Sequence, residues 1–541
     1  METISGQLLK DMLISASNAI GTQKQEVNEL NVFPVPDGDT GTNMSMTMGS
    51  AMRELSKLSA QTVTEVADLA ATSLLRGARG NSGVILSLLF RGIAKGLKDK
   101  AEASGTDLAA ALQAGVDSAY KAVMKPAEGT ILTVARESAQ EAARASSQGG
   151  GALAVFQAAV NSAKQALANT PELLPVLKKA GVVDAGGKGL VIIFDAMLYT
   201  LSGNGILQAE EPAQTAAEIS GAAGEVDDEE INFTYCTEFI INKSTAFAKD
   251  PLSLRAYLES IGDCVLVADD SNFIKVHVHT DNPGKVIQEA LGFGYLTDMK
   301  IDNMRVQHER KAAAKSEPVP PEKPYGFVVV AAGKGVADLF KDLGADTIVE
   351  GGQTMNPSTE DILAAIESTP AENVIVLPNN KNIILAAEQT VSLADRKVHV
   401  LHTKTIPQGI SALLSFDADT ALNDNLLEME AACDHVKTGL ITFAARDSDF
   451  EGHKIKKDEI LALANGKLSF TDNDPVKAAV RLTKSLSDKD TSYVTLIYGE
   501  GISPEQAEAA RKAAAEKLGP QVEVNLINGG QPVYHFILSV E

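Results

Sequence analysis

The sequence contains no tryptophan, three cysteines, and no run of apolar residues approaching the ~18 that a membrane-spanning helix requires. Three cysteines are too few, and odd in number, for a disulfide framework, so we expect a reducing compartment. The first ten residues lack the basic stretch followed by an apolar core that marks a secretory signal. These absences predict a cytoplasmic protein with no integral membrane association.

Aromatic residues make up 5% of the chain, so its cores must be built from Leu, Ile, Val, Ala and Met. Basic residues are also scarce: 48 Lys and Arg stand against 71 Asp and Glu, which gives a net charge of −23. This balance argues against nucleic acid as the main partner, because phosphate backbones are bound by basic surfaces. It argues equally against electrostatic docking on anionic lipid.

A length of 541 residues exceeds the roughly 250–300 that one hydrophobic core supports, so several domains are expected. Two segments are predicted to be linkers. Residues 208–230 are rich in Ala, Gly, Glu and Asp, and residues 312–324 contain four prolines. The linkers separate three predicted domains, at residues 1–207, 231–311 and 325–541.

The three predicted domains differ in their apolar patterns. The first is predicted to be all-helical, a bundle or barrel, because apolar residues recur at helical spacing. Its windows are residues 8–20, 44–55, 62–76, 82–98, 106–123, 130–145, 150–169 and 187–202. The second mixes strand-like runs at 233–241, 264–268 and 273–279 with helical windows, which predicts a small α+β domain. The third alternates strands and helices, as α/β domains do.

An acidic, Gly-containing loop precedes the second helical window and reads Asp37-Gly38-Asp39-Thr40-Gly41-Thr42-Asn43. Asp37 and Asp39 are separated by one glycine, so both carboxylates can face one point, as oxygen ligands of Mg²⁺ do. Gly41 allows close approach of backbone N–H groups to a phosphate, and the helix N-terminus that follows favours anions. Thr40, Thr42 and Asn43 add short donors. The loop therefore predicts a metal–phosphate site, with an N-capping turn as the alternative.

Three further Gly-containing loops open predicted helices in the same domain. They contain Asn81 and Ser82, Gly129 and Thr130, and the run Asp184-Ala185-Gly186. Each alone could be an ordinary helix–helix turn, but four such loops in one all-helical domain favour a nucleotide site. Arg79 is a candidate for bringing two anions together, with a surface arginine as the alternative. No Walker A motif is present.

The second domain contains Cys236 in one strand-like run and a His277-x-His279 pair in another. Two residues separated by one position in a strand face the same side. One Cys and two His form a plausible three-ligand Zn²⁺ set with an open fourth position. The alternative is a strand pair with two polar residues and a buried thiol. In the third domain, the Asn-rich loop around Lys381 follows a predicted strand, where α/β domains often place binding surfaces.

The first domain resembles the nucleotide-binding L-type domain of dihydroxyacetone kinases. The resemblance rests on Asp37-Gly38-Asp39 with Thr40–Asn43, Asn81-Ser82-Gly83, Gly129-Thr130 and Asp184-Ala185-Gly186. It implies an eight-helix antiparallel barrel that binds ATP and two Mg²⁺ at one end. In that family a third carboxylate precedes the pair, whereas this chain has Asn31 in the corresponding place. Asn31 offers a carbonyl oxygen with one negative charge fewer, which leaves the number of Mg²⁺ ions open.

The whole chain is similar to a narrower family, the ATP-binding subunit of bacterial fatty acid kinase. This resemblance implies transfer of the ATP γ-phosphate to the carboxylate of a fatty acid, giving acyl phosphate for phospholipid synthesis. A separate DegV-type protein would hold the fatty acid and dock on the C-terminal domain, itself α/β and DegV-like.

The same family has a matching Cys and His-x-His in its middle domain, which supports zinc there. A middle domain between two linkers would suit a homodimer interface. Two alternative functions remain: a dihydroxyacetone-type small-molecule kinase, and a non-catalytic ATP-sensing scaffold.

Overall fold

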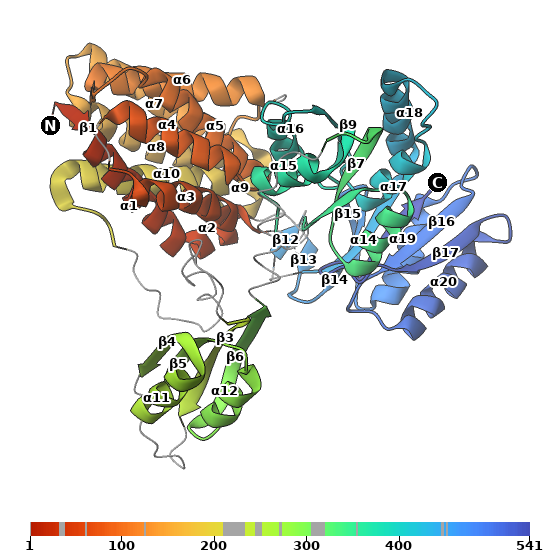
Figure 1. The fold of residues 1–541 in the computed structure, drawn as a ribbon. Coiled ribbons are helices and arrows are strands. Elements are labelled where there is room, and N and C mark those ends of the chain that lie inside the picture. The colour runs from red at the N-terminus through yellow and green to blue at the C-terminus, as the bar shows by residue number, and fades with distance from the viewer. Residues whose placement is uncertain are drawn as a thin grey trace. The chain divides into compact units, whose positions relative to one another are not determined.

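The computed structural model describes residues 2–31, 38–59, 62–123, 126–208, 233–243, 251–269, 273–303, 320–352, 355–444, 448–450 and 453–541. The chain forms two compact units. One combines Met1–Glu210 with Pro318–Glu541, and the other is Glu211–Glu317 (Figure 1). Within the part of the chain that the structure describes, no helix has the length and apolar character needed to span a bilayer.

The N-terminal region is a ring of helices, as predicted (Figure 1). Each long helix packs against the next, and α10 returns to α1 and closes the ring. Two short helices, α2 and α9, and the two-stranded sheet of β1 and β2 were not predicted. The elements are β1 (Thr3–Ser5), α1 (Gly6–Thr22), α2 (Lys24–Leu30), α3 (Thr40–Lys57), α4 (Val63–Arg76), α5 (Gly80–Gly96), β2 (Glu102–Ser104), α6 (Gly105–Ala122), α7 (Ile131–Ser147), α8 (Ala152–Leu173), α9 (Pro175–Ala180), α10 (Ala185–Tyr199) and the π-turn Thr200–Asn204.

Local sequence signals explain where several of these helices begin and how closely they pack. Thr62 and Ser104 form capping boxes at the starts of α4 and α6, which satisfy backbone N–H groups that a helix leaves unpaired. Glycines bring α5 and α6 into backbone contact: a Cβ at Gly92 would lie 2.2 Å from the Ala114 carbonyl oxygen. The ring is therefore filled by aliphatic side chains and by close helix approach, as the shortage of aromatic residues requires.

The second unit is a small α+β domain, also as predicted. Its four strands form an antiparallel sheet in the order β4-β5-β3-β6. Apolar side chains from one face of the sheet share a core with α11 and α12. The edge strand β6 was not predicted. The elements are β3 (Tyr235–Lys243), α11 (Pro251–Ile261), β4 (Gly262–Asp269), β5 (Phe273–Thr280), α12 (Pro283–Ala290) and β6 (Gly294–Asn303).

The C-terminal region begins with an α/β layer. Its sheet has the order β10-β9-β7-β8 and is parallel throughout. Residues 323 and 324, which the sequence analysis placed in a linker, belong to strand β7. The elements are β7 (Lys323–Ala331), α14 (Lys334–Asp342), β8 (Thr347–Glu350), α15 (Thr359–Ser368), β9 (Ala371–Leu377), α16 (Ile384–Thr390), β10 (Lys397–Val400), α17 (Ile406–Leu414) and α18 (Leu422–His435).

A second, mixed sheet completes the C-terminal region, in the order β15-β14-β11-β18-β16-β17. Strands β14 and β15 were not predicted, and the other strands of this sheet were. The elements are β11 (Lys437–Phe443), β14 (Ile460–Ala464), β15 (Lys467–Asp472), α19 (Pro475–Leu486), β16 (Tyr493–Tyr498), α20 (Pro504–Leu518), β17 (Glu523–Asn528) and β18 (Phe536–Val540), with the short hairpin β12 (Ser448–Phe450) and β13 (His453–Ile455).

The parallel sheet is buried on both faces. Along β7, Val328 and Val330 enter the same core as the helical ring, whereas Phe327 and Val329 enter a second core on the opposite side. This is why β7 reads as a continuous apolar run and not as an alternating one. Helix α15 contacts α4, and α16 contacts α5, so the ring and the first C-terminal layer form one continuous body.

Candidate functional site

Four helix N-termini meet at one end of the ring. A Cβ at Gly80, the first residue of α5, would lie 2.6 Å from the Asn43 side chain in the first turn of α3. A Cβ at Gly186 of α10 would lie 3.3 Å from Ile131, which begins α7, and one at Gly189 would lie 2.5 Å from Met44 of α3. Helix N-termini carry partial positive charge and unpaired N–H groups, so this end of the ring favours anions.

In the acidic loop, Asp37 lies outside the described residues and Asp39 immediately precedes α3. Thr40 Oγ1 accepts a hydrogen bond from Asn31 Nδ2 at 3.1 Å. This bond directs the amide nitrogen of Asn31 toward α3. Asn31 and Asp39 thus flank the start of α3.

Helix α2, which the sequence did not predict, holds the acidic loop from the other side. Asn28 accepts from the backbone N–H of Thr42 at 3.1 Å and donates to its hydroxyl at 3.0 Å. A Cβ at Gly41 would lie 2.0 Å from the Lys24 carbonyl oxygen, so the close approach of α2 requires glycine there. Asn28 therefore positions the start of α3, a role that the local sequence pattern did not reveal.

The second loop is anchored by Arg79. Its guanidinium donates to the Asn356 carbonyl oxygen at 2.8 Å and lies 3.3 Å from the Asp361 carboxylate. Asn81 donates to Asn382 Oδ1 at 3.3 Å, while its own buried Oδ1 has no partner among the described residues. A buried acceptor without a donor is unusual and fits a place where a bound ligand or water supplies one. Ser82 follows in the first turn of α5.

The third and fourth loops are joined by one carboxylate. Asp184 caps α10 by accepting from the Gly187 N–H at 2.7 Å, and it also accepts from the backbone of Ile131 at the start of α7. Burial raises the pKa of Asp184 to about 6, against the lowering effect of these two bonds. The hydroxyl of Thr130 caps α7 through the Leu132 N–H at 3.4 Å. Two of the predicted site residues thus build helix N-termini.

The C-terminal region forms a wall beside these loops. Asn356, 3% exposed, donates through Nδ2 to Asp39 Oδ2 at 2.6 Å. The Thr359 N–H donates to the Ala78 carbonyl oxygen at 3.1 Å, and Ser358 forms a backbone bridge with Arg79. Sequence reasoning missed this wall because its residues lie more than 270 positions from the loops they contact, and no local pattern links them.

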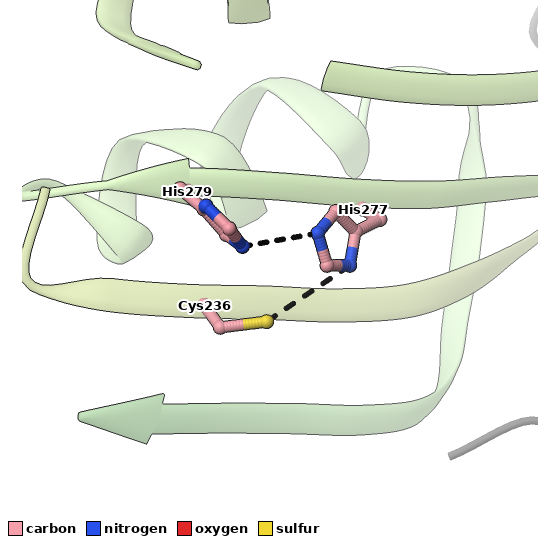
Figure 2. A group of neighbouring side chains, drawn as sticks. All are labelled: Cys236, His277 and His279. Atoms are coloured by element: carbon pink, nitrogen blue, oxygen red, sulfur yellow. Dashed lines mark hydrogen bonds between the residues drawn. The ribbon is translucent and has the colours of Figure 1, made fainter. Parts of the chain in front are cut away.

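A candidate metal centre lies in the second unit, on adjacent strands β3 and β5 (Figure 2). Cys236 Sγ is 3.9 Å from His277 Nδ1, and His277 Nε2 is 3.2 Å from His279 Nε2. One ligand atom from each residue lies within 4.8 Å of the others. Tetrahedral zinc with Zn–N of ~2.0–2.1 Å and Zn–S of ~2.3 Å places its donors about 3.3–3.6 Å apart, so the three side chains would need to move slightly closer to bind one ion.

The surroundings of the three donors also suit a metal. His279 is 8% exposed, and its Nδ1 lies 3.5 Å from the carboxylate of Asp263 on β4. A carboxylate beside the second ring nitrogen orients a metal-bound histidine and fixes its tautomer. Asp263 was not predicted, because it lies in a different strand from either histidine and becomes adjacent only in the sheet.

Family models match almost the whole chain in three consecutive parts. The DAK2 domain matches residues 34–199, the FakA-like middle domain of fatty acid kinase matches residues 232–311, and the FakA-like C-terminal domain matches residues 326–541. The helical ring and its loops thus form a DAK2 domain, which two further domains follow in the chain. The chain belongs to the FakA-like family of fatty acid kinase proteins.

Full-length relatives have the same extent. Protein YloV of Bacillus subtilis is 42% identical over 100% of both chains, and an uncharacterized protein of Staphylococcus aureus strain bovine RF122 is 40% identical over 99% of both. Two solved DegV family structures each align with 40% of this chain. The one from Corynebacterium glutamicum has a TM-score of 0.31 at 14% identity over 96% of its own chain. The fatty-acid-binding one from Thermus thermophilus has a TM-score of 0.30 at 15% identity over 99%.

Two contacts between the C-terminal wall and the loops at the helix N-termini should differ in how much they stabilise the fold. Asn356→Ala should lower the unfolding free energy by about 1.5–3 kcal/mol, because it removes the hydrogen bond that a buried amide donates to a partly buried carboxylate. Asp361→Asn should cost less than about 1 kcal/mol, because Asp361 is half-exposed and its ion pair is screened. Urea titrations of both variants and wild type measure the difference. Equal costs would contradict the buried Asn356–Asp39 contact.

The raised pKa of Asp184 predicts a specific pH dependence. A carboxyl group that holds its proton more tightly when folded favours folding at low pH, and this contribution is lost as pH rises through about 6. Asp184→Asn should therefore gain about 2–3 kcal/mol over wild type between pH 4.5 and 7.5. Urea titrations at both pH values measure this gain. The matched control is Asp195→Asn, a partly exposed position on the same helix, which should show no such gain; a pH-independent difference for Asp184→Asn would refute the effect.

Metal content tests the Cys236–His277–His279 centre in the full chain. Cys236→Ser should reduce bound zinc from about one ion per chain to a small fraction, since a three-ligand site loses its thiolate. Elemental analysis after growth in zinc-supplemented medium measures the stoichiometry. Cys433→Ser, which removes a buried thiol in the other unit, should leave the zinc content unchanged. Wild-type protein without zinc under these conditions would exclude the site.

Proposed function

We propose that this chain is the ATP-dependent phosphotransferase of a two-protein fatty acid kinase. It would transfer the ATP γ-phosphate to the carboxylate of a fatty acid presented by a separate DegV-type protein. The observation that carries the proposal is the meeting of four helix N-termini with Asp39 at one end of a DAK2 domain. Membership of the FakA-like fatty acid kinase family supports the choice of acceptor.

Phosphoryl transfer depends chiefly on positioning the reactants and neutralising their charge. Different residues of the site would serve these two roles. Asp37, Asp39 and Asn31 would hold Mg²⁺. When bound, Mg²⁺ neutralises charge on the β- and γ-phosphate oxygens. The starts of α3 and α5, with residues 40–43, Asn81 and Ser82, would bind phosphate oxygens through backbone N–H groups and short polar side chains.

The remaining nucleotide-end residues would complete the site. Gly129, Thr130, Ala185 and Gly186 would form the opposite side through the starts of α7 and α10, with Asp184 holding the two helices together. Arg79 would bring the two anions together from its position between the ring and the C-terminal wall. A fatty acid carboxylate is already ionised at pH 7, so the acceptor needs no general base.

The other two parts of the chain would serve the complex. The C-terminal region would dock the DegV-type partner, close to the loops it already contacts. The middle unit would bind Zn²⁺ through Cys236, His277 and His279, with the fourth coordination position open, and would provide a homodimer interface. The donor geometry of the three side chains and the family to which the chain belongs support the zinc site.

Replacement of Asp39 tests the kinase reaction. Asp39→Ala should reduce acyl-phosphate formation by at least about 100-fold, because it removes a carboxylate that would hold the Mg²⁺ needed to neutralise the phosphate charge. The assay traps acyl phosphate with hydroxylamine in a mixture of this chain, ATP, Mg²⁺ and a fatty-acid-loaded DegV-type protein. Asp68→Ala, at an exposed position on α4, is the matched control and should retain full activity.

Two outcomes would count against the proposal. Undiminished turnover by the Asp39→Ala variant would remove Asp39 from the site. ADP formation with dihydroxyacetone, and none with the fatty-acid-loaded protein, would favour the small-molecule kinase instead. If the wild type binds ATP but forms ADP with neither acceptor, the ATP-sensing scaffold is favoured.

A further inference from the structure

The C-terminal region encloses a cavity of about 450 Å³ between its two sheets. One wall is formed by the segments that follow β7, β8, β9 and β10, and the opposite wall by Leu440, Leu463 and Ile537 of the mixed sheet. Because the first sheet is parallel, the carboxyl ends of its strands share one edge, which is where open α/β sheets bind ligands. The volume lies in the range of small-molecule sites.

One end of the cavity is basic, in a chain whose net charge is −23. Lys381 and Lys404 line it with exposed side chains, and neither forms an ion pair with a described residue. Lys437 also lines the cavity but is bonded to Asp488, and Asp434 is the acidic residue of the lining. Lysines therefore outnumber acids here, against the composition of the whole chain.

Helix α17 adds to this basic end. It is nine residues long, begins at Ile406 in the cavity wall, and is capped by Thr405, whose hydroxyl accepts from the Gln408 N–H at 3.4 Å. A helix N-terminus beside two lysines favours a carboxylate or phosphate group. The basic end is thus formed by two separate strand–helix connections, one after β9 and one after β10.

Asn379 in the same wall is conformationally constrained. Its φ of 53° is in the left-handed region, and its side chain is 6% exposed. Its Nδ2 donates to the Val330 carbonyl oxygen at 3.1 Å, but its buried Oδ1 has no partner among the described residues. Left-handed non-glycine residues and unsatisfied buried polar atoms gather where proteins bind ligands.

The opposite side of the cavity is apolar. Leu440, Leu463 and Ile537 contribute aliphatic surface there. Cys433 instead lies beside the start of α17, where its Sγ donates to the Gln408 carbonyl oxygen at 3.5 Å; its thiol is neutral at physiological pH because burial, with a smaller effect of Asp434, raises its pKa to about 11. The cavity therefore has a cationic end and an aliphatic end.

We propose that this cavity binds an amphipathic anion, with a carboxylate or phosphate head at Lys381, Lys404 and the start of α17. The apolar body of the ligand lies against Leu440, Leu463 and Ile537. This ligand is bound within the chain itself. It is separate from the acceptor of the proposed kinase reaction, which a partner protein presents.

The absence of tryptophan provides a clean binding assay. Tyr534 lines the cavity, so Tyr534→Trp introduces a single indole whose fluorescence reports occupancy there and not elsewhere. The probes are sodium laurate, monododecyl phosphate and the neutral methyl laurate, each below micelle-forming concentration and without ATP or partner protein. We expect a saturable fluorescence change, and a raised midpoint of thermal unfolding, with one or both anions and not with the ester.

Charge variants then test the site of the head group. Lys381→Ala combined with Lys404→Ala should weaken binding of the anion at least about tenfold, the loss expected for charge-assisted hydrogen bonds. Lys484→Ala, an exposed lysine outside the cavity lining, should leave the affinity unchanged. Binding by laurate alone identifies a carboxylate site, and binding by the phosphate alone identifies a phosphate site.

Three results would overturn the proposal: no saturable change with either anion, equal affinity for the methyl ester, or full affinity in the double lysine variant. These measurements use neither ATP nor a DegV-type partner. Their failure would therefore leave the proposed kinase reaction untouched, and loss of kinase activity in Asp39→Ala would say nothing about the cavity.

Discussion

A continuous apolar core joins the helical ring to the parallel sheet of the C-terminal region. The arrangement of residues at the end of the ring where the four helix N-termini meet depends on this core. Val328 and Val330 of β7 and Ile366 of α15 lie in the same core as the ring. Polar contacts alone would hold the two parts weakly, since a partly exposed ion pair such as Arg79–Asp361 contributes about 1 kcal/mol or less. The shared core fixes the geometry, and only then can a buried amide such as that of Asn356 reach Asp39.

At the same end of the ring, several polar groups lower the stability of the folded state, and interactions elsewhere must offset this loss. Desolvation of the Asp184 carboxylate is unfavourable, and its raised pKa reflects that cost. The chain tolerates the group because it joins two helix N-termini that would otherwise expose unpaired N–H groups. Asn81, with its unsatisfied oxygen, belongs to the same pattern. Stability is given up where anions would be bound, which is common at functional sites.

The long helices and most strands could be predicted because period and length are local properties of a sequence. Strands β14 and β15 were missed, since the run Ile460–Ala464 has the Leu and Ala content of a helix. The Asn465-Gly466 pair that joins them, with φ of 47° and 78°, is a hairpin signal that could have corrected this. The Cys236–His277–His279 group was predicted from the sequence, and the structure brings the three side chains together, although their binding of a metal stays a prediction. Asn356 and Asp263 needed the tertiary fold, because nothing near them in sequence indicates what they contact.

Two segments of the C-terminal region each line the cavity on one side and lie close to the helical ring on the other. The loop after β9 lines the cavity with Asn379 and Asn380 and touches α5 through Asn382. After β8, Gly352 lines the cavity and its N–H donates to the Met355 carbonyl oxygen at 2.8 Å, next to Asn356, which holds Asp39. If the proposed cavity ligand shifts these segments and so changes the affinity of the proposed Mg²⁺–nucleotide site, occupancy of that site must change the affinity of the cavity for its ligand by the same factor, because binding linkage is reciprocal. Under the two proposals, the cavity and the loop end of the helical ring would be two sites of one thermodynamic cycle.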